Sequence, residues 1–365
     1  MIQVFRVRNH SRAIGLGEKT EEADSMKTSV VWKFSLVLFA ALALLVACGA
    51  QEEAEETAAI AVVFATGGLG DQSFNDAAFR GMQQAGERFG IEYDYAEPSA
   101  VADYDSFLDQ FAASGRYALI VSIGFDQADA LGDVASRYPE QQFAIVDMVV
   151  DAPNVASFVY AEQERGFLMG VAAALATQDA DDPMTNSQKR IGVIGGMQIP
   201  LIDANIAGYI AGAKWVDRDV QVSHSYVGDW ADPARGKELA ISMIENGVDV
   251  VWGAAGRSGL GVLDAAREQG VYGMGADSEQ DHVAPGHILT NGLKLVDETV
   301  LIAVEQVLAD NFQPGIQVLG VADGALGYSE SLLSAAIIER LEDAVRAITA
   351  GEVELPDTIE AARAL

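Results

Sequence analysis

From residue 59 onward, short apolar runs rich in β-branched residues alternate with amphipathic segments. The first runs are IAVVFA (60–65), YALIVSI (117–123) and QFAIVDMVV (142–150). Each is apolar at nearly every position, as expected for a parallel strand that helices cover on both faces. We predict the intervening helices at 74–89, 104–114 and 126–138, and a further strand at 154–160.

A second series of the same kind follows. Its strands are predicted at 190–196, 221–227, 248–255 and 271–277, and its helices at 163–177, 201–217, 233–246 and 258–269. Further strands are expected near 288–294 and 316–322, and further helices near 297–310 and 331–350. Two such series in 365 residues predict an α/β protein with two doubly wound, Rossmann-like lobes.

The two lobes are expected to exchange chain segments. We assign 59–160 and 281–315 to the first lobe, and 161–280 and 316–355 to the second. The three crossings between them are then expected near 159–162, 279–284 and 313–317. Because these connections can act as hinges, we expect the lobes to close on a ligand.

Polar residues follow the predicted strands at their carboxyl ends. They include Asp71 to Asn75, Asp147, Gly253 to Gly256 and Asp277. Ligands of open α/β sheets bind beyond the carboxyl ends of the strands. If the lobes face each other, these residues line one cleft, and such a cleft is typical of a bilobed solute receptor.

The charge of the chain restricts its partners. The formal net charge is −31, and only four lysines follow residue 47. Nucleic-acid binding requires clustered Lys and Arg to neutralise phosphates, so we exclude a nucleic-acid partner. Half of the residues are apolar and 21% are charged, as in a globular protein.

The N-terminal region is expected to be an export signal. Lys27 and Lys33 precede the apolar segment SLVLFAALALLVA (35–47), which is short for a membrane span, and Cys48 follows directly. The sequence Leu-Val-Ala-Cys (45–48) resembles a bacterial lipobox, in which the cysteine is acylated. We therefore predict a leader over 1–47, with Met26 as the start, and an acylated Cys48 opening an acidic linker over 48–58. The alternative is a signal anchor that ends in an incidental thiol. Acyl chains would hold the protein at the extracytoplasmic side of the cell membrane.

Patterns typical of enzymes are weak in this chain. The histidines beyond residue 48 lack metal-ligand spacing, and no nucleophile–base pair is apparent. The run GLGVLD (259–264) lacks the last glycine of a dinucleotide fingerprint. The DADDP cluster (179–183) could suggest a calcium or nucleoside-hydrolase site, but its proline and the Thr-Asn-Ser that follow favour a solvated loop. We expect no enzyme activity, no cofactor and no metal.

Two aromatic residues lie where a core residue is not expected. Phe74 precedes Asn75 at a helix start, and Trp230 lies in the polar turn GDWADPARGK. One ring from each lobe would sandwich a flat heterocycle, and Asn75 could both donate to and accept from its edge. The alternative for Phe74 is packing at the start of its own helix.

Carboxylates and one lysine complete the set of candidate ligand-binding residues. Asp147 and Asp277 end predicted strands, and each ionised oxygen can accept a hydrogen bond from a vicinal diol. Lys294 lies in ILTNGLK, opposite these carboxylates. Its alternatives are a surface lysine or an ion-pair partner of Asp277.

Seven segments in unbroken order resemble one family. They are GDQSFNDAAFRG (70–81), ASFVYAEQERGFLMGVAAALAT (156–177), IGVIGG (191–196), GDWADPARGKELAISMI (228–244), VVWGAAGRSGLGVLDAAREQG (250–270), GADSEQ (275–280) and LTNGLKLVDETV (289–300). The chain is similar to the basic membrane protein family over about residues 58 to 350. These are bacterial solute-binding lipoproteins of ABC transporters, and the best understood bind purine nucleosides.

The resemblance implies a type I periplasmic-binding-protein fold and a nucleoside held between aromatic rings. The family motif D-K-S-F-N, which supplies base contacts, is Asp71-Gln72-Ser73-Phe74-Asn75 here, with Gln in place of Lys. The ring of the second lobe is usually Phe in the family and is Trp230 here. The family's G-V-D-x-D-Q is GADSEQ (275–280), which keeps the ribose-type Asp277.

The expected ligand-binding residues are Asp71, Ser73, Phe74, Asn75, Asp147, Trp230, Gly253, Gly256, Asp277 and Lys294. The expected function is that of a membrane-anchored receptor that delivers a nucleoside, first of all a purine nucleoside, to an ABC permease. The alternatives are a receptor of the same fold for a sugar or signalling ligand, and a nucleoside-processing enzyme. The larger Trp230 leaves the base preference open.

Overall fold

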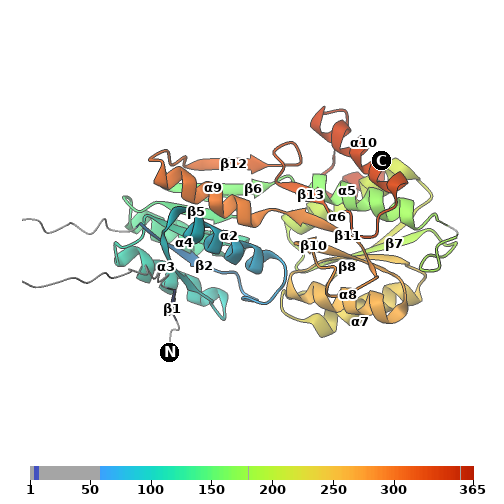
Figure 1. Ribbon diagram of the computed structural model, residues 1–365, viewed down its shortest axis with the longest axis horizontal. Helices are drawn as coiled ribbons and strands as arrows, with labels where there is room; N and C mark the ends of the chain where they lie inside the picture. Colours follow the sequence, from blue (N-terminus) through green and yellow to red (C-terminus); the bar gives the residue numbers. More distant parts are fainter. Residues whose placement is uncertain (1–3, 8–57, 180, 354) are drawn as a thin grey trace, which may run out of the picture.

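The computed structural model describes residues 4–7, 58–179, 181–353 and 355–365. They form two α/β lobes that lie end to end, each built on its own sheet (Figure 1). The leader, Cys48 and the linker up to residue 57 fall outside the described part, apart from strand β1 (Val4–Val7). The predicted fold class, two doubly wound lobes, is confirmed.

The first lobe contains a sheet with strand order β1-β3-β2-β4-β5-β6-β12 among the described residues. From β3 to β12 all neighbouring strands are parallel, and β1 pairs antiparallel with β3. The strands are β2 (Ala59–Val63), β3 (Glu92–Ala96), β4 (Leu119–Ile123), β5 (Phe143–Val146), β6 (Val155–Tyr160) and β12 (Gly315–Leu319).

Helices cover both faces of this sheet, which explains why its strands are apolar at nearly every position. Helices α2 (Phe74–Phe89) and α9 (Val296–Leu308) pack together on one face, over Ile60 and Val62. Helices α3 (Tyr104–Ala113) and α4 (Ala128–Arg137) cover the alternate residues Ala61 and Val63 on the other face.

The second lobe contains a sheet with strand order β13-β11-β10-β9-β7-β8. Its neighbouring strands are parallel except for the antiparallel pair of β11 with β13. The strands are β7 (Arg190–Gly195), β8 (Gln221–Tyr226), β9 (Val250–Ala254), β10 (Tyr272–Asp277), β11 (Ile288–Lys294) and β13 (Leu326–Tyr328).

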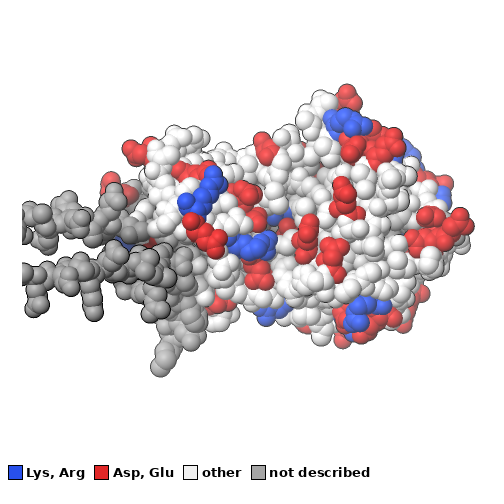
Figure 2. Space-filling view, viewed as in Figure 1, with Lys and Arg blue, Asp and Glu red and all other residues white. Residues whose placement is uncertain are grey.

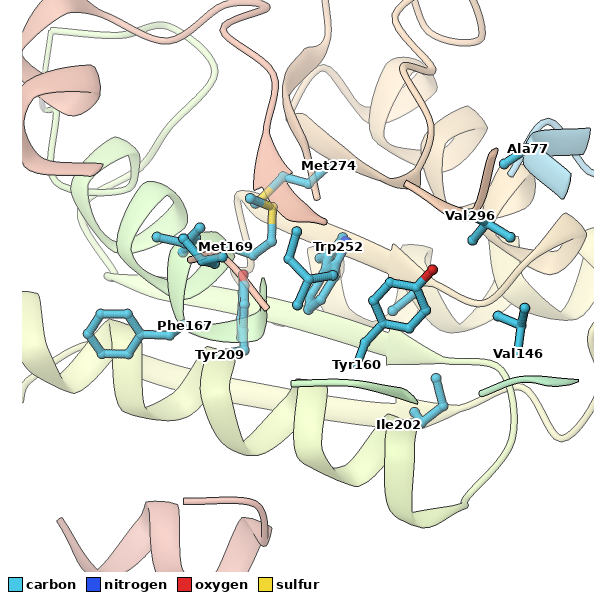
Figure 3. Packing of buried hydrophobic residues seen from close by; sticks show 14 of the residues in the cluster. Ala77, Val146, Tyr160, Phe167, Met169, Ile202, Tyr209, Trp252, Met274 and Val296 are labelled. Atoms are coloured by element: carbon cyan, nitrogen blue, oxygen red, sulfur yellow. The ribbon is translucent and has the colours of Figure 1, made fainter. Parts of the chain in front are cut away.

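Two pairs of helices cover the second sheet. Helices α5 (Glu162–Ala176) and α6 (Pro200–Val216) cover one face, with α10 (Ala335–Thr349) and α11 (Ile359–Ala364) packed on their outer side. Helices α7 (Pro233–Glu245) and α8 (Arg257–Gln269) cover the other face. One hydrophobic cluster continues through both lobes, from Phe167 and Tyr209 past Trp252 to Tyr160 and Val146 (Figure 3).

The exchange of segments between the lobes differs in part from the prediction. The first crossing, between β6 and α5 at 160–162, lies where it was expected. The other two do not, because β11 pairs with β10 in the second sheet and β12 pairs with β6 in the first. The chain therefore crosses at 294–296 and again at 319–326, so 281–294 belongs to the second lobe and 315–319 to the first. The strand β11 follows β10 after the connection over residues 278–287 and pairs with it in parallel.

Helices α5 and α6 are in unusually close contact because glycines face the partner backbone. A Cβ added at Gly170 would lie 2.1 Å from the Tyr209 carbonyl oxygen, and Gly212 is placed similarly against Phe167. Gly170→Ala must therefore separate the helices, and we expect it to lower the free energy of unfolding by about 1–3 kcal/mol. Urea unfolding measures this change.

Gly132→Ala is the control for this prediction. Gly132 lies on α4, and a Cβ added there would have only a Val150 methyl near it, at 3.8 Å. Removal of this helical glycine is expected to be neutral or stabilising, and equal losses in both variants would contradict the packing argument.

A buried carboxyl in the second lobe is expected to make stability depend on pH. Asp249 is fully buried, and burial raises its pKa to about 6 even though hydrogen bonds from Thr177 and the Asn186 N–H lower it. The folded form holds this proton more tightly than the unfolded form, so stability is lost as pH rises from about 4 to 6. Asp249→Asn keeps the acceptor for the Asn186 N–H, 2.8 Å from Asp249 Oδ2. We expect it to stabilise the protein by about 1–3 kcal/mol at pH 7.5 and very little near pH 4. Unfolding of the parent and of the variant at pH 7.5 and near pH 4 measures this stabilisation. If the two proteins differ in stability by the same amount at both pH values, the charge of Asp249 is not the cause.

Two further observations concern the charge of the surface and the apolar character of the helices. Acidic side chains are spread over both lobes, and within the described part no continuous basic patch forms on the face that Figure 2 shows. No helix in the described ranges has both the length and the apolar character needed to cross a membrane.

Candidate ligand-binding cleft

A cavity lies between the lobes at the carboxyl ends of both sets of strands. It encloses about 690 Å³ of empty space, part of which opens to solvent. This volume is within the range of small-molecule sites, and the position is the one expected for open α/β sheets. From the first lobe it is lined by Ala65, Thr66, Gly67, Asp71, Phe74, Asn75, Gly124, Phe125, Asp126 and Asp147. From the second it is lined by Arg165, Leu201, Ile202, Trp230, Ala254, Gly256, Arg257, Ala276, Asp277 and Lys294.

Eight of the ten residues expected from the sequence line this cavity, and Ser73 and Gly253 do not. Gly253 lies within β9, where an added Cβ would contact Gly259 and Val262 of α8, so this position is turned into the lobe. Ser73 is buried one residue away from the wall. Its hydroxyl donates to Asp277 Oδ2 at 2.5 Å, so it supports a cavity carboxylate from the opposite lobe.

Asp71 caps the helix that carries Phe74. Its two oxygens accept the backbone N–H groups of Ser73, Asn75 and Asp76 at 2.8–3.1 Å. The side chain satisfies donors that an α-helix leaves unpaired at its start. Burial nevertheless raises the pKa of Asp71 to about 6. Asp71 therefore positions the start of α2, and its acceptors are already occupied.

Asn75 also has a structural bond. Its Oδ1 accepts the backbone N–H of Ala65 at 3.0 Å, which holds the loop after β2. The side-chain nitrogen has no acceptor in the described chain and remains available to the cavity. One lone pair of Oδ1 is thus used within the protein, and the expectation that Asn75 both donates to and accepts from a ligand stays a prediction.

Phe74 and Trp230 come from opposite lobes and line the same cavity. Phe74 is the first residue of α2, and Trp230 lies in the turn between β8 and α7. The indole rests against Gly196, because a Cβ there would come within 2.2 Å of its Cζ3 atom. Phe125 meets the indole edge-on, with ring centroids 6.4 Å apart. The glycine at the end of β7 thus makes room for the larger ring.

Lys294 is buried at the side of the cavity nearest the crossings. Its Nζ lies 2.6 Å from Asp147 and 2.7 Å from Glu162, and its side chain is 2% exposed. Burial alone would lower the pKa of Lys294, but the charges of Asp147 and Glu162 raise it above its ordinary value. The ammonium also lies 5.1 Å from the ring centroid of Phe74. Lys294 is therefore neither a surface lysine nor the direct partner of Asp277.

Arg165 is the partner of Asp277. Its guanidinium contacts Asp277 Oδ1 at 2.5 Å and Glu162 Oε2 at 2.8 Å, and Nε donates to Asn205. Burial would raise the pKa of Glu162, yet the charges of Arg165 and Lys294 hold it below its ordinary value. Two cations and three carboxylates thus form one network that joins both lobes, which we call the hinge charge network (Asp147, Glu162, Arg165, Asp277, Lys294).

Two aspartates of this network have strained backbones. Asp147 directly follows β5 and has a φ angle of 75°. Asp277 is the last residue of β10 and has a φ angle of 66°. Non-glycine residues rarely adopt this left-handed region, and they do so mainly where surrounding structure imposes it, often at functional sites. This turn also explains why β5 ends at Val146, whereas a strand up to 150 was predicted.

Further contacts close the lobes over the cavity. Arg257 of α8 donates to the Leu69 carbonyl at 2.5 Å, and Arg80 of α2 donates to Ser278 Oγ at 3.0 Å. Gln280 donates to the Gln72 carbonyl at 3.0 Å. These bonds hold the two lobes together beside the cavity.

The described residues contain no group of three or more His, Cys, Asp or Glu side chains arranged to hold a metal ion. His224 lies on β8 beside Arg363, and His287 contacts the Val271 carbonyl. Neither lines the cavity.

Sequence reasoning missed several cavity residues. Arg165 and Glu162 were read only as part of a helix, although two opposite charges at i and i+3 in an otherwise apolar segment were a usable signal. Phe125 and Asp126 follow β4 at its carboxyl end and could have been found by the rule that identified Asp147.

Comparisons with known proteins agree with this geometry. A family model described as ABC transporter substrate-binding protein PnrA-like matches residues 58–358. The ABC transporter nucleoside-binding protein BmpA of Lactococcus lactis is 34% identical over 277 residues, which cover 71% of this chain and 76% of that protein. An uncharacterized lipoprotein of Pyrococcus abyssi is 34% identical over 282 residues, which cover 74% of this chain and 68% of that protein.

A solved structure shows the same fold. The ABC transporter solute-binding protein of Aeropyrum pernix has a TM-score of 0.77 and 30% identity, and the match covers 84% of this chain and 96% of that one. The chain therefore belongs to the basic membrane protein family, whose members are substrate-binding components of ABC transporters.

Proposed function

We propose that this protein is a lipid-anchored receptor that captures a nucleoside, first of all a purine nucleoside, and delivers it to its permease. The observation that carries the proposal is the pair of rings, Phe74 and Trp230, which opposite lobes contribute to one closed cavity. The Lactococcus relative, which is named a nucleoside-binding protein, supports the same ligand class.

The two ends of the cavity suit the two halves of a nucleoside. The ring end has the flat faces of Phe74 and Trp230, and stacking on such rings contributes about 1–3 kcal/mol per base. On the far side of Phe74 from Trp230, Asp147, Asp277 and Lys294 can accept from and donate to ribose hydroxyls, with the Lys294 ammonium 5.1 Å from the Phe74 ring centroid. A base between the rings and a ribose against the hinge charge network use both ends.

Closure of the lobes would couple binding to recognition by the permease. Candidate contacts come from both lobes, so a bound nucleoside stabilises the closed form over an open one. The interlobe bonds of Arg257 and Arg80 would form in the same step. The permease then receives only the loaded, closed receptor.

Isothermal titration tests the proposal on the chain from residue 49 onward. Guanosine, inosine and adenosine are expected to bind, uridine more weakly, and ribose not measurably. Tight binding of ribose without the nucleosides would favour a sugar receptor of the same fold. Release of free base over hours would instead indicate a nucleoside-processing enzyme.

The lipid anchor has its own test. Cys48→Ser is expected to abolish acylation, because the lipobox cysteine supplies the only thiol of the chain. The protein should move from the membrane to the soluble fraction or persist as uncleaved precursor. Metabolic labelling with a fatty acid such as palmitate and cell fractionation measure this. Ser35→Ala within the leader is the control, and unchanged labelling of the Cys48 variant would remove the anchor from the proposal.

A further inference from the structure

One carboxylate of the cavity differs from the others in its partners. Asp147 and Asp277 contact the cations of the hinge charge network, and Asp71 accepts three backbone N–H groups. Asp126, at the carboxyl end of β4, forms no ion pair within the described part of the chain. Its charge is thus not compensated by a cation, and it lies in the first turn of the short 3-10 helix Phe125–Gln127 that precedes α4.

Hydroxyl groups orient Asp126 without using up its acceptors. Its Oδ2 accepts from the Tyr104 hydroxyl at 3.0 Å and from Thr66 Oγ1 at 3.4 Å. Tyr104 is fully buried and is itself fixed by the Thr66 backbone N–H at 2.9 Å. The bonds from Tyr104 and Thr66 both go to Oδ2, and Oδ1 accepts from no other residue that the structure describes. Burial raises the pKa of Asp126, as expected for a carboxylate that lacks a cation.

Asp126 lies at the ring end of the cavity. Its neighbour Phe125 contacts the Trp230 ring, and the loop that contains Thr66 continues to Gly67, where an added Cβ would lie 3.7 Å from Trp230 Cβ. In the sheet, β4 is separated from the crossing strand β6 by β5. A base held against Trp230 therefore presents an edge to Asp126, while the ribose faces the hinge charge network.

We propose that Asp126 selects 6-oxopurine nucleosides, guanosine above all, by accepting the N–H groups on the Watson–Crick edge of the base. The proposal rests on the nucleoside-binding function above and names the preferred ligand within that class.

The chemistry of the carboxylate sets the preference. An ionised carboxylate only accepts hydrogen bonds, and its two oxygens match two parallel donors. Guanine presents N1–H and an N2 amino group side by side, and hypoxanthine presents N1–H alone. Adenine presents one amino group next to the N1 lone pair, which the carboxylate repels. A good bidentate pair of this kind distinguishes bases by about 10- to 100-fold.

The first experiment uses the unmodified chain from residue 49. Isothermal titration should show guanosine binding at least tenfold more tightly than adenosine, with inosine between them. 1-Methylguanosine lacks the N1–H and should lose about tenfold or more relative to guanosine. If adenosine or 1-methylguanosine binds as tightly as guanosine, the selection by Asp126 is wrong while the nucleoside receptor stands. If no nucleoside binds, both proposals fail.

The second experiment changes the carboxylate. Asp126→Asn can donate as well as accept, so it should weaken guanosine binding and bring the guanosine-to-adenosine ratio to within about threefold. Asp133→Asn, at an exposed site on α4, removes the same charge and should leave the ratio unchanged. Thermal melts of both variants verify folding. A folded Asp126 variant that retains the parent ratio would overturn the proposal, and the titrations of the unmodified chain decide it if that variant does not fold.

Discussion

Lys294→Met is expected to lower the free energy of unfolding by about 3–5 kcal/mol at pH 7. The change removes one cation from the hinge charge network and leaves Asp147 and Glu162 buried without it. Removal of one partner of a buried ion pair is strongly destabilising, because the remaining charges stay desolvated and uncompensated. Urea unfolding of the ligand-free chain measures the loss.

Two comparisons separate this effect from a general loss of charge. Lys189→Met removes a lysine whose pair with Asp217 is exposed to solvent, and we expect little change in stability. Adding Asp147→Asn to Lys294→Met should recover part of the loss, since Asp147 loses its cation whereas Glu162 keeps Arg165 at 2.8 Å. If Lys294→Met and Lys189→Met unfold at the same urea concentration, the hinge charge network does not contribute to the stability of the protein.

Asp147 is the member of the hinge charge network whose pKa lies above its ordinary value because of burial. Burial raises its pKa to about 6 even though Lys294 is in contact with it. A ligand hydroxyl that donates to Asp147 would favour the ionised form, so binding and proton release are linked at this end of the cavity.

The strand ends could be predicted because fully buried parallel strands are apolar on both faces. That pattern located β2, β4, β5 and β7 to β11, and with them Asp147, Asp277 and Phe74, but not β13. It missed β3, where Asp94 interrupts the apolar run. Asp94 is buried, and its Oδ2 accepts from Arg116 at 2.6 Å and from the Tyr117 hydroxyl at 2.7 Å, two partners that are distant in sequence.

The lobe boundaries could not be read from a one-dimensional pattern. Strands β11 and β12 look alike in sequence, and only the pairing of β12 with β6 and of β11 with β10 assigns them to opposite lobes. The same limit applies to the cavity. Arg165 lies inside a helix and reaches Asp277, which is 112 residues away, so its role depends on tertiary structure.

Phe74→Ala and Trp230→Ala are each expected to weaken nucleoside binding by about 1–3 kcal/mol, and the double variant by more than either. Each change removes one ring that lines the cavity and leaves the hinge charge network intact. The loss should be similar for guanosine and adenosine, because every base has a π-face, whereas Asp126→Asn is expected to change their ratio. Isothermal titration measures the dissociation constant of each variant for each nucleoside. Trp230→Phe should cost far less than Trp230→Ala because a ring remains.

Gly196→Ala tests the same ring without removing it. The added methyl would lie 2.2 Å from the indole Cζ3, so the ring must move away from β7 and into the space that a base would occupy. Nucleoside binding should fall by an amount comparable to that for Trp230→Ala, while stability changes little because Trp230 is only partly buried. Trp215→Phe is the control, since this indole packs on Phe167, away from the cavity. If both ring truncations bind purine nucleosides as tightly as the parent does, no base is held between the rings, and the cleft of this receptor serves another solute.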